Sequence, residues 1–267
     1  MVWLGACRTA VLPALALILA TGPAADLVKV RHAEGLVHGF LVLRDTSDRA
    51  IARGELLQTA RGTQVTSQLT FHFNDGSFYD DTAVFSQRTS FRLIRDRLRQ
   101  RGPSFPHAID MTIAAASGKV SVKYTDDGEE KTADKTMTLP PDLANGLIPV
   151  LLKNVDRKAP PKELPMIVAT PKPTLITLEA ASATPRPFSK SDDRRQVTEY
   201  VLKPKIGGLK GVLAPLLGQE PEDAHVWILE GEAPAFLAAE QQFYPEGPLW
   251  RIELSVPGWQ AGRGGGS

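Results

Sequence analysis

The sequence predicts a mainly β protein, in which one large, strongly curved antiparallel sheet accompanies one or two short helices. Three observations lead to this fold class. From Leu36 to Leu139, short β-prone runs alternate with turn residues, as in an antiparallel meander. Apolar residues in these runs recur at every second position. A clear helical pattern appears at 142–153, where prolines 140 and 141 stand at the expected start.

The first half of the chain carries the strand pattern most plainly. In "QLTFHF", Leu69, Phe71 and Phe73 alternate with polar residues and predict one apolar face. The next residues, 74–76, read "NDG" and predict a hairpin turn, because Asn and Gly tolerate a positive φ. The runs "FYDDTAVF", "IDMTIAA" and "KVSVKY" repeat the alternation, with a further turn at "DDG", residues 126–128.

Residues 88–101, "RTSFRLIRDRLRQR", hold six arginines and one aspartate. A helix would place Arg88, Arg92, Arg95 and Arg99 along one face. The β-prone residues just upstream favour a strand over 89–100 instead. Because an odd separation changes face in a strand, we then expect Arg92 and Arg95 to project from opposite faces.

The second half begins with the helix at 142–153, although Gly146 and Pro149 weaken its interior. A polar, proline-rich connector at 156–165 could divide the chain, but five further strand-like runs follow it. A short apolar segment at 209–217 predicts a second helix. We expect a single β-rich domain over 25–257, with a disordered glycine-rich tail at 258–267.

The N-terminus predicts export. Arg8 precedes an apolar run that is short for a membrane span and ends in small residues, which is the form of a signal peptide over 1–24. Cys7, the only cysteine, would be removed with it, so the mature chain has no disulfide or thiolate metal site. The net charge of +1 and export together exclude nucleic acid as an expected partner.

Catalytic motifs are absent from the sequence. It contains no nucleophile elbow, phosphate loop, zinc-binding helix or dinucleotide fingerprint. The five histidines are isolated, so no metal site is expected, and His72 should lie on the polar side of its strand. Asp80 and Asp81 are adjacent in a strand, so their carboxylates should diverge and be solvated. We therefore expect a protein that is not an enzyme and has no cofactor.

Two sets of residues are candidate ligand contacts. A cleft between the curved sheet and the helix would be lined by Phe71, Phe73, Phe85, Phe91, Leu147 and Leu151. An anionic group could be held by Arg92, Arg95, Arg97 and Arg99. Each set also has a simpler interpretation, since buried aromatics usually form core and charged residues keep a strand edge from pairing.

Five segments together resemble a family of uncharacterised exported bacterial proteins that carry a domain of unknown function: "VRHAEGLVHGFLVLRD", "FNDGSFYDDTAVFSQRTSFRL", "YTDDGEEK", "LPPDLANGLIPVLLKN" and "PLWRIELS". The resemblance covers nearly the whole mature chain and brings no known catalytic residue. More distantly, the chain resembles the open β-barrel with a helical plug of periplasmic lipoprotein carriers, which implies an open barrel here. We expect a periplasmic or envelope protein that binds a lipid or other hydrophobic ligand. The alternative is an interaction or scaffold module that uses an exposed strand edge.

Overall fold

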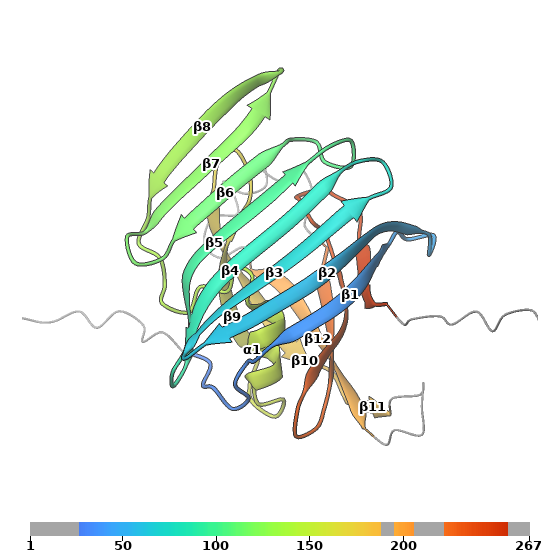
Figure 1. The fold of residues 1–267 in the computed structure, drawn as a ribbon. Helices are drawn as coiled ribbons and strands as arrows, with labels where there is room; N and C mark the ends of the chain where they lie inside the picture. The colour runs from blue at the N-terminus through green and yellow to red at the C-terminus, as the bar shows by residue number, and fades with distance from the viewer. Residues whose placement is uncertain (1–26, 188–194, 206–221, 256–267) are drawn as a thin grey trace, which may run out of the picture.

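The computed structural model describes residues 27–187, 195–205 and 222–255, and in this part the chain forms one 15-stranded antiparallel sheet (Figure 1). The first eight strands are β1 (Val37–Arg44), β2 (Ala50–Arg61), β3 (Gln64–Phe73), β4 (Phe78–Gln87), β5 (Phe91–Arg101), β6 (Ile109–Ala114), β7 (Lys119–Asp126) and β8 (Glu129–Thr136). The others are β9 (Lys162–Val168), β10 (Thr174–Ser182), β11 (Arg186–Pro187), β12 (Gln196–Lys205), β13 (Ala224–Leu229), β14 (Ala235–Gln241) and β15 (Trp250–Leu254). The predicted signal peptide at 1–24, the second helix at 209–217 and the tail at 258–267 lie outside the described residues.

The order of the strands confirms the predicted fold class, a curved antiparallel sheet that stays open. The path runs β8-β7-β6-β5-β4-β3-β2-β1-β15-β14-β13-β12-β10-β9, with β11 beside β12, so β8 and β9 form its two edges. One sheet therefore contains strands from both sides of the predicted connector at 156–165, and residues 162–165 of that connector belong to β9 itself. The inward lysines of β8, Lys131 and Lys135, are charges of the kind that discourage edge-to-edge pairing.

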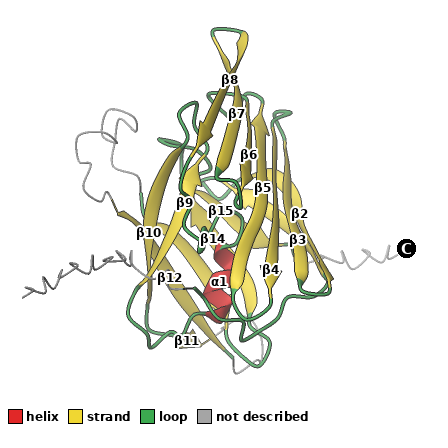
Figure 2. Cartoon of the chain, turned by 90° about the vertical axis from the view of Figure 1, so that its left-hand side faces the viewer, coloured by secondary structure: helices red, strands yellow, loops and turns green. Residues whose placement is uncertain are grey.

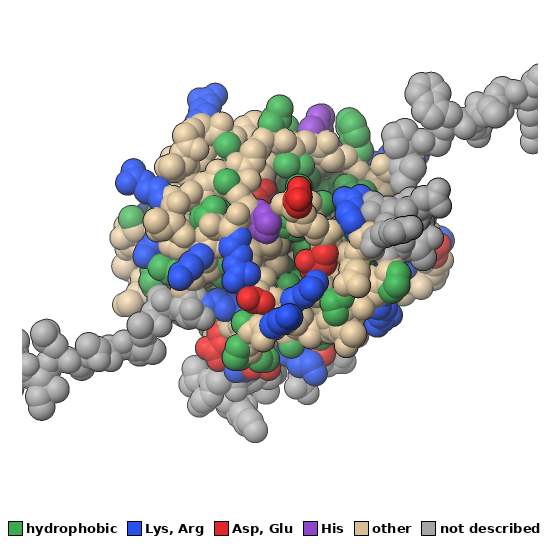
Figure 3. Space-filling view, turned by 90° about the horizontal axis from the view of Figure 1, so that it is seen from below, with side chains coloured by type: hydrophobic (Ala, Val, Ile, Leu, Met, Phe, Trp, Pro, Cys, Tyr) green, Lys and Arg blue, Asp and Glu red, His purple; other side chains and the backbone are tan. Residues whose placement is uncertain are grey.

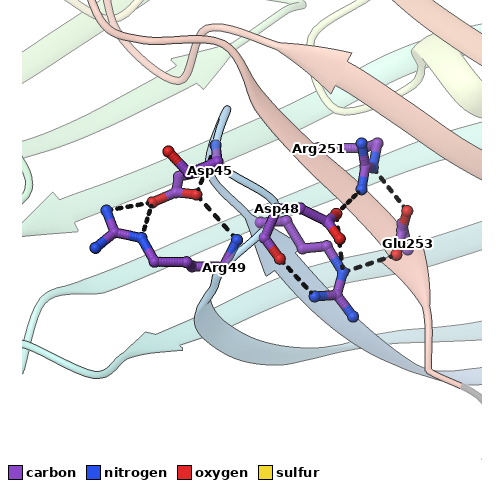
Figure 4. A network of polar contacts seen from close by, with 7 residues as sticks. Asp45, Asp48, Arg49, Arg251 and Glu253 are labelled. Atoms are coloured by element: carbon purple, nitrogen blue, oxygen red, sulfur yellow. Dashed lines mark hydrogen bonds and ion pairs between the residues drawn. The ribbon is translucent and has the colours of Figure 1, made fainter.

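The two halves of the sheet meet where β1 pairs with β15, near the two ends of the described chain. Figure 4 shows the polar network at this seam. The Nε of Arg44 donates to Glu253 at 3.0 Å, and Arg251 bonds both Glu253 and Asp48. Because Asp48 belongs to the β1–β2 turn, the network fastens that turn to the last strand.

The helix is shorter than predicted. Helix α1 spans Ile148–Asn154, not 142–153. Gly146 adopts a φ of +64°, which is left-handed and incompatible with a continuing α-helix, and Pro149 falls in the first turn, where its missing N–H costs nothing. The signals that weakened the predicted helix are thus the ones that set its start.

Residues 140–147 join the β9 edge to the inner face of β4 and β5. The N–H of Ala144 donates to the carbonyl of Pro165 on β9 at 2.8 Å. The Asn145 side chain bonds both the N–H and the carbonyl of Ile167, at 2.8 and 2.9 Å. The amide of Asn145 therefore takes the place of a neighbouring strand along the β9 edge.

The concave side of the sheet is filled with side chains, and α1 lies within it between the two arms (Figure 2). At the end away from α1, a cluster of rings in edge and tilted contacts joins β3, β4, the β5–β6 loop and the β14–β15 region: Phe73, Tyr79, Phe105, Phe243, Tyr244 and Trp250. Such pairs contribute about 0.5–1.5 kcal/mol each beyond the burial of their surface. They bind the two halves into one core.

Candidate functional site

The arginine-rich stretch forms β5, which confirms the predicted strand and not the helical alternative. The pairing of β5 with β4 is interrupted: Val84 is opposite Arg95, but Phe85 is opposite Leu93. Ile94 is therefore an extra residue in β5, a β-bulge. Leu93 is buried before the bulge and Asp96 after it, while Arg92 and Arg95 are both exposed.

This bulge overturns the expectation that Arg92 and Arg95 project from opposite faces. Arg92 and Arg95 are three residues apart, so a regular strand would place them on opposite faces. The extra residue, Ile94, shifts the alternation by one position, so every arginine of β5 lies on the outer face of the sheet. The row consists of Arg92, Arg95, Arg97, Arg99 and Arg101. On the outer face of β4 and β6, the only carboxylates are Asp80 and Asp110.

Both of these carboxylates are already paired. Arg97 holds Asp110 with two bonds, at 2.9 and 2.6 Å. Arg99 bonds Asp80 at 2.9 Å, and Gln68 and Thr70 also donate to the Asp80 carboxylate. Burial alone would raise the pKa of Asp80, but these hydrogen bonds and the Arg99 charge outweigh it and lower the pKa.

The remaining arginines of the row are available to a ligand. Within the described chain, the side chains of Arg92 and Arg95 have no ion-pair or hydrogen-bond partner. Arg101 lies over the ring of Phe78, with its guanidinium carbon 5.3 Å from the ring centroid. Lys119 and Lys123 of β7 face the same side and extend the positive surface.

A pocket of about 330 Å³ lies at the Arg101 end of the row. Its wall combines cations with apolar and aromatic groups: Phe78, Arg99, Arg101, Ile109, Lys123 and Tyr124 are among its lining residues. Two carboxylates also line it, Asp110, which Arg97 holds, and Glu130. The Nε of Arg99 is buried there without a hydrogen-bond partner. No local sequence pattern indicates this pocket, because Lys123 and Tyr124 come from β7, a strand two positions away from β5 in the sheet.

The residues predicted to line an internal cleft are all buried in the core. The exposed fractions of Phe71, Phe73, Phe85, Phe91, Leu147 and Leu151 range from 0% to 7%. Phe85 and Phe91 contact each other edge to face at 6.1 Å between ring centroids. None of the six lines the pocket beside Arg101, so a ligand between the sheet and α1 would have to displace core side chains.

Asp80 and Asp81 diverge as predicted, but Asp80 is buried and Asp81 is only partly exposed. The Asp80 side chain is 3% exposed, and Asp81 points inward to Asp96 of β5. The Oδ1 atoms of Asp81 and Asp96 are buried beside Gly146 without a hydrogen-bond partner among the described residues. Burial raises the pKa of Asp81 to about 6, and burial and the Asp81 charge raise that of Asp96 well above its usual value. The two carboxyls therefore titrate together and not as independent groups.

The histidines of the described strands do not form a metal centre. His72 is exposed on the outer face, as predicted, while His38 and His225 bond Glu55 and Glu199. No group of three or more metal-binding side chains occurs in the described part of the chain. None of the described helices is long and apolar enough to cross a membrane.

Comparison with known families finds no matching family model, and comparison with curated proteins finds no match either. Among solved structures, the chain is similar to a crystal structure described as a beta-barrel-like protein of Domain of Unknown Function DUF1849 from Brucella abortus. The identity is 9%, the match covers 84% of this chain and 98% of that one, and the TM-score is 0.44. The similarity is to an uncharacterised barrel-like domain and assigns no residue and no activity.

Proposed function

We propose that this chain is an exported, non-enzymatic binding protein of the cell envelope, which holds an anionic amphiphile such as a phospholipid on the outer face of β5. The observation that carries the proposal is the bulge at Ile94, which places five arginines on one face beside a pocket with a partly apolar wall. Arginine binds phosphate through two parallel hydrogen bonds, and the available phosphates outside the cytoplasm are chiefly lipid head groups.

The pocket and the row have complementary roles in this proposal. Arg92 and Arg95 would meet the anionic groups of a membrane surface, since neither has a partner to exchange. Phe78 and Ile109 would contact the first part of an acyl chain while Arg101 contacts the phosphate. The internal cleft is not required, which agrees with the burial of the six residues expected to line it.

The test is binding of the purified chain to vesicles of anionic phosphatidylglycerol, with vesicles of zwitterionic phosphatidylcholine for comparison. The double substitution Arg92→Gln with Arg95→Gln breaks no ion pair, so the fold should be retained. Since each basic residue near an anionic surface contributes about 1 kcal/mol, the loss in affinity should be about thirtyfold. Arg186→Gln with Lys203→Gln removes the same charge elsewhere and should leave binding unchanged.

Two results would contradict the proposal. One is wild-type protein that does not prefer anionic vesicles at low salt. The other is equal loss of binding in both double variants, which would indicate a response to net charge alone. Substituting Phe78→Ala should weaken binding further only if the pocket takes part.

A second candidate, an interaction module, rests on the free edge of β8. No described strand pairs with the far side of Glu129–Thr136, and a partner could add a strand there. Such a partner would protect the backbone amides of β8 from hydrogen exchange. Its inward lysines and exposed charges favour the first proposal, because they disfavour strand addition.

A further inference from the structure

A second pocket, of about 170 Å³, lies at the C-terminal end of α1. Its wall comes from four parts of the chain: the segment before β1, the end of α1, β12 and the β13–β14 turn. Figure 3 shows this lower end of the molecule, where side chains of both charges gather around the centre of the face. The segment at 28–30 bonds the start of β5, so this pocket and the arginine pocket lie at opposite ends of that 11-residue strand.

Three hydrogen-bond donors face this pocket without a strong partner. Within the described residues, the guanidinium of Arg157 makes no hydrogen bond, and its approach to Glu230 is 3.9 Å. Arg31 reaches Asp156 only at 3.4 Å. The Tyr200 hydroxyl also has no hydrogen bond to a described residue, although the Tyr200 residue is 3% exposed.

The tyrosine is held in its donor form. Burial, followed by the nearby Glu230 charge, raises the pKa of Tyr200 to about 12, while Arg157 acts in the opposite direction. At neutral pH its hydroxyl is therefore protonated. A neutral hydroxyl and two guanidinium groups around a small cavity provide donors to oxygen atoms.

The wall is held in place by the fold and does not depend on a ligand. The Oδ1 atom of Asn154 accepts from the backbone N–H groups of Arg31 and His32, at 2.9 and 2.7 Å. Lys153 is bonded within 2.7 Å to the buried carboxylate of Glu34. Lys153 is therefore already paired with Glu34. Arg31 and Arg157 have only long contacts, with Asp156 and Glu230, and could bind a ligand in place of these carboxylates.

We propose that this pocket is a second binding site, for a small oxyanion such as phosphate or a compact carboxylate, held by Arg31, Arg157 and the Tyr200 hydroxyl. The bound anion replaces Glu230 as the partner of Arg157. The carboxylate of Glu230 competes with the ligand, so the empty site is kept near neutrality and favours a small, doubly charged group. The volume accommodates such an anion and excludes a whole lipid.

The test is calorimetric titration of the full chain with inorganic phosphate, supported by thermal unfolding in sodium phosphate and in sodium chloride of equal ionic strength. A site predicts a phosphate-specific increase in the unfolding temperature that grows with the logarithm of concentration. Because hydrogen bonds to charged groups are strong, Arg157→Gln and Tyr200→Phe should each weaken phosphate about tenfold. Titration with succinate tests whether the site accepts carboxylates.

Glu230→Gln provides the decisive variant, since it removes the competing charge and should tighten phosphate severalfold, a gain that damage to the fold would not produce. Arg186→Gln, which removes an exposed arginine elsewhere, should bind as wild type does. Equal stabilisation by phosphate and chloride would overturn the proposal. So would phosphate affinity that is unchanged by Arg157→Gln and Glu230→Gln, because the anion would then be bound elsewhere. Binding to anionic vesicles is a separate property and should be unaffected by either variant.

Discussion

Replacing Asp81 by asparagine tests the buried carboxyl pair, and it should make the protein more stable at neutral pH. In the folded chain, burial raises the pKa of Asp81 from 3.8 to about 6, although its hydrogen bond with Asp96 acts in the opposite direction. An acid with a raised pKa in the folded state binds more protons there than in the unfolded state. Its contribution to stability is therefore complete below pH 3.8 and is lost as the pH rises through about 6.

The magnitude follows from the difference between these pKa values, which is about two pH units. Since one pH unit corresponds to about 1.36 kcal/mol, the free energy of unfolding should fall by about 3 kcal/mol in total, and by about 2 kcal/mol between pH 4.5 and 7.5. In a chain of this size, that loss corresponds to a decrease of about 4–8 °C in the unfolding temperature. Asp80, whose pKa is lowered, acts at lower pH and with the opposite sign, so it does not obscure this window.

The assay is urea unfolding of wild type and Asp81→Asn at several pH values between 4.5 and 7.5. Asparagine has the same shape and can donate to Asp96, so the variant should lose the share of the decline that Asp81 causes, about 2 kcal/mol, and exceed wild type at pH 7.5. The share from Asp96, whose pKa burial also raises, should remain. Asp127→Asn, in an exposed turn with a φ of +51°, is the control and should follow wild type. If Asp81→Asn declined as steeply as wild type, the proposed linkage would be wrong.

Three further substitutions test how residues 140–147 and the segment before β1 are held. Gly146→Ala should lower the free energy of unfolding by about 2–5 kcal/mol, because a Cβ there would lie 2.5 Å from that of Ala83 and the φ is +64°. The control Gly62→Ala, at a φ of +60° with open space around it, should lower it by only about 1–2 kcal/mol. Asn145→Ala should cost about 2–5 kcal/mol and accelerate hydrogen exchange at the Ile167 amide, since it leaves two buried backbone groups unpaired. Glu34→Ala should cost about 3–5 kcal/mol, because it leaves the ammonium of Lys153, 13% exposed, without its partner.

Chemical denaturation measures all three costs. Equal losses for the two glycine variants would exclude steric contact at Gly146. An unchanged exchange rate at Ile167 would mean that the Asn145 bonds do not hold the β9 edge. A Glu34 variant as stable as wild type would show that the buried ion pair contributes little net stabilisation.

Local sequence determined the strands and their turns. The alternation in β3 and the hairpin turns at 74–76 and 126–128 depend on neighbouring residues, and the latter turn has φ values of +51° at Asp127 and +80° at Gly128. The start of α1 also has local causes, in Gly146 and Pro149. Such features are predictable because period, positive φ and proline geometry act over a few residues.

Some strands required tertiary context. Strand β14, "AFLAAEQ", was not predicted, since alanine and glutamate favour strands poorly; it is extended because it lies between β13 and β15. The pairing of β1 with β15 likewise joins residues that are distant in sequence. Neither feature has a signal within its own segment.

The candidate sites were decided almost wholly by tertiary structure. The arginines of β5 were visible in the sequence, but the bulge at Ile94 arises only from the register with β4, and one extra residue reverses the side on which later side chains lie. Asp81 and Asp96 meet because β4 and β5 pair, and Arg31, Arg157 and Tyr200 meet because the sheet curves around α1. The sequence determines which chemical groups are present and their local conformation, whereas their grouping depends on contacts between distant segments, which no local pattern encodes.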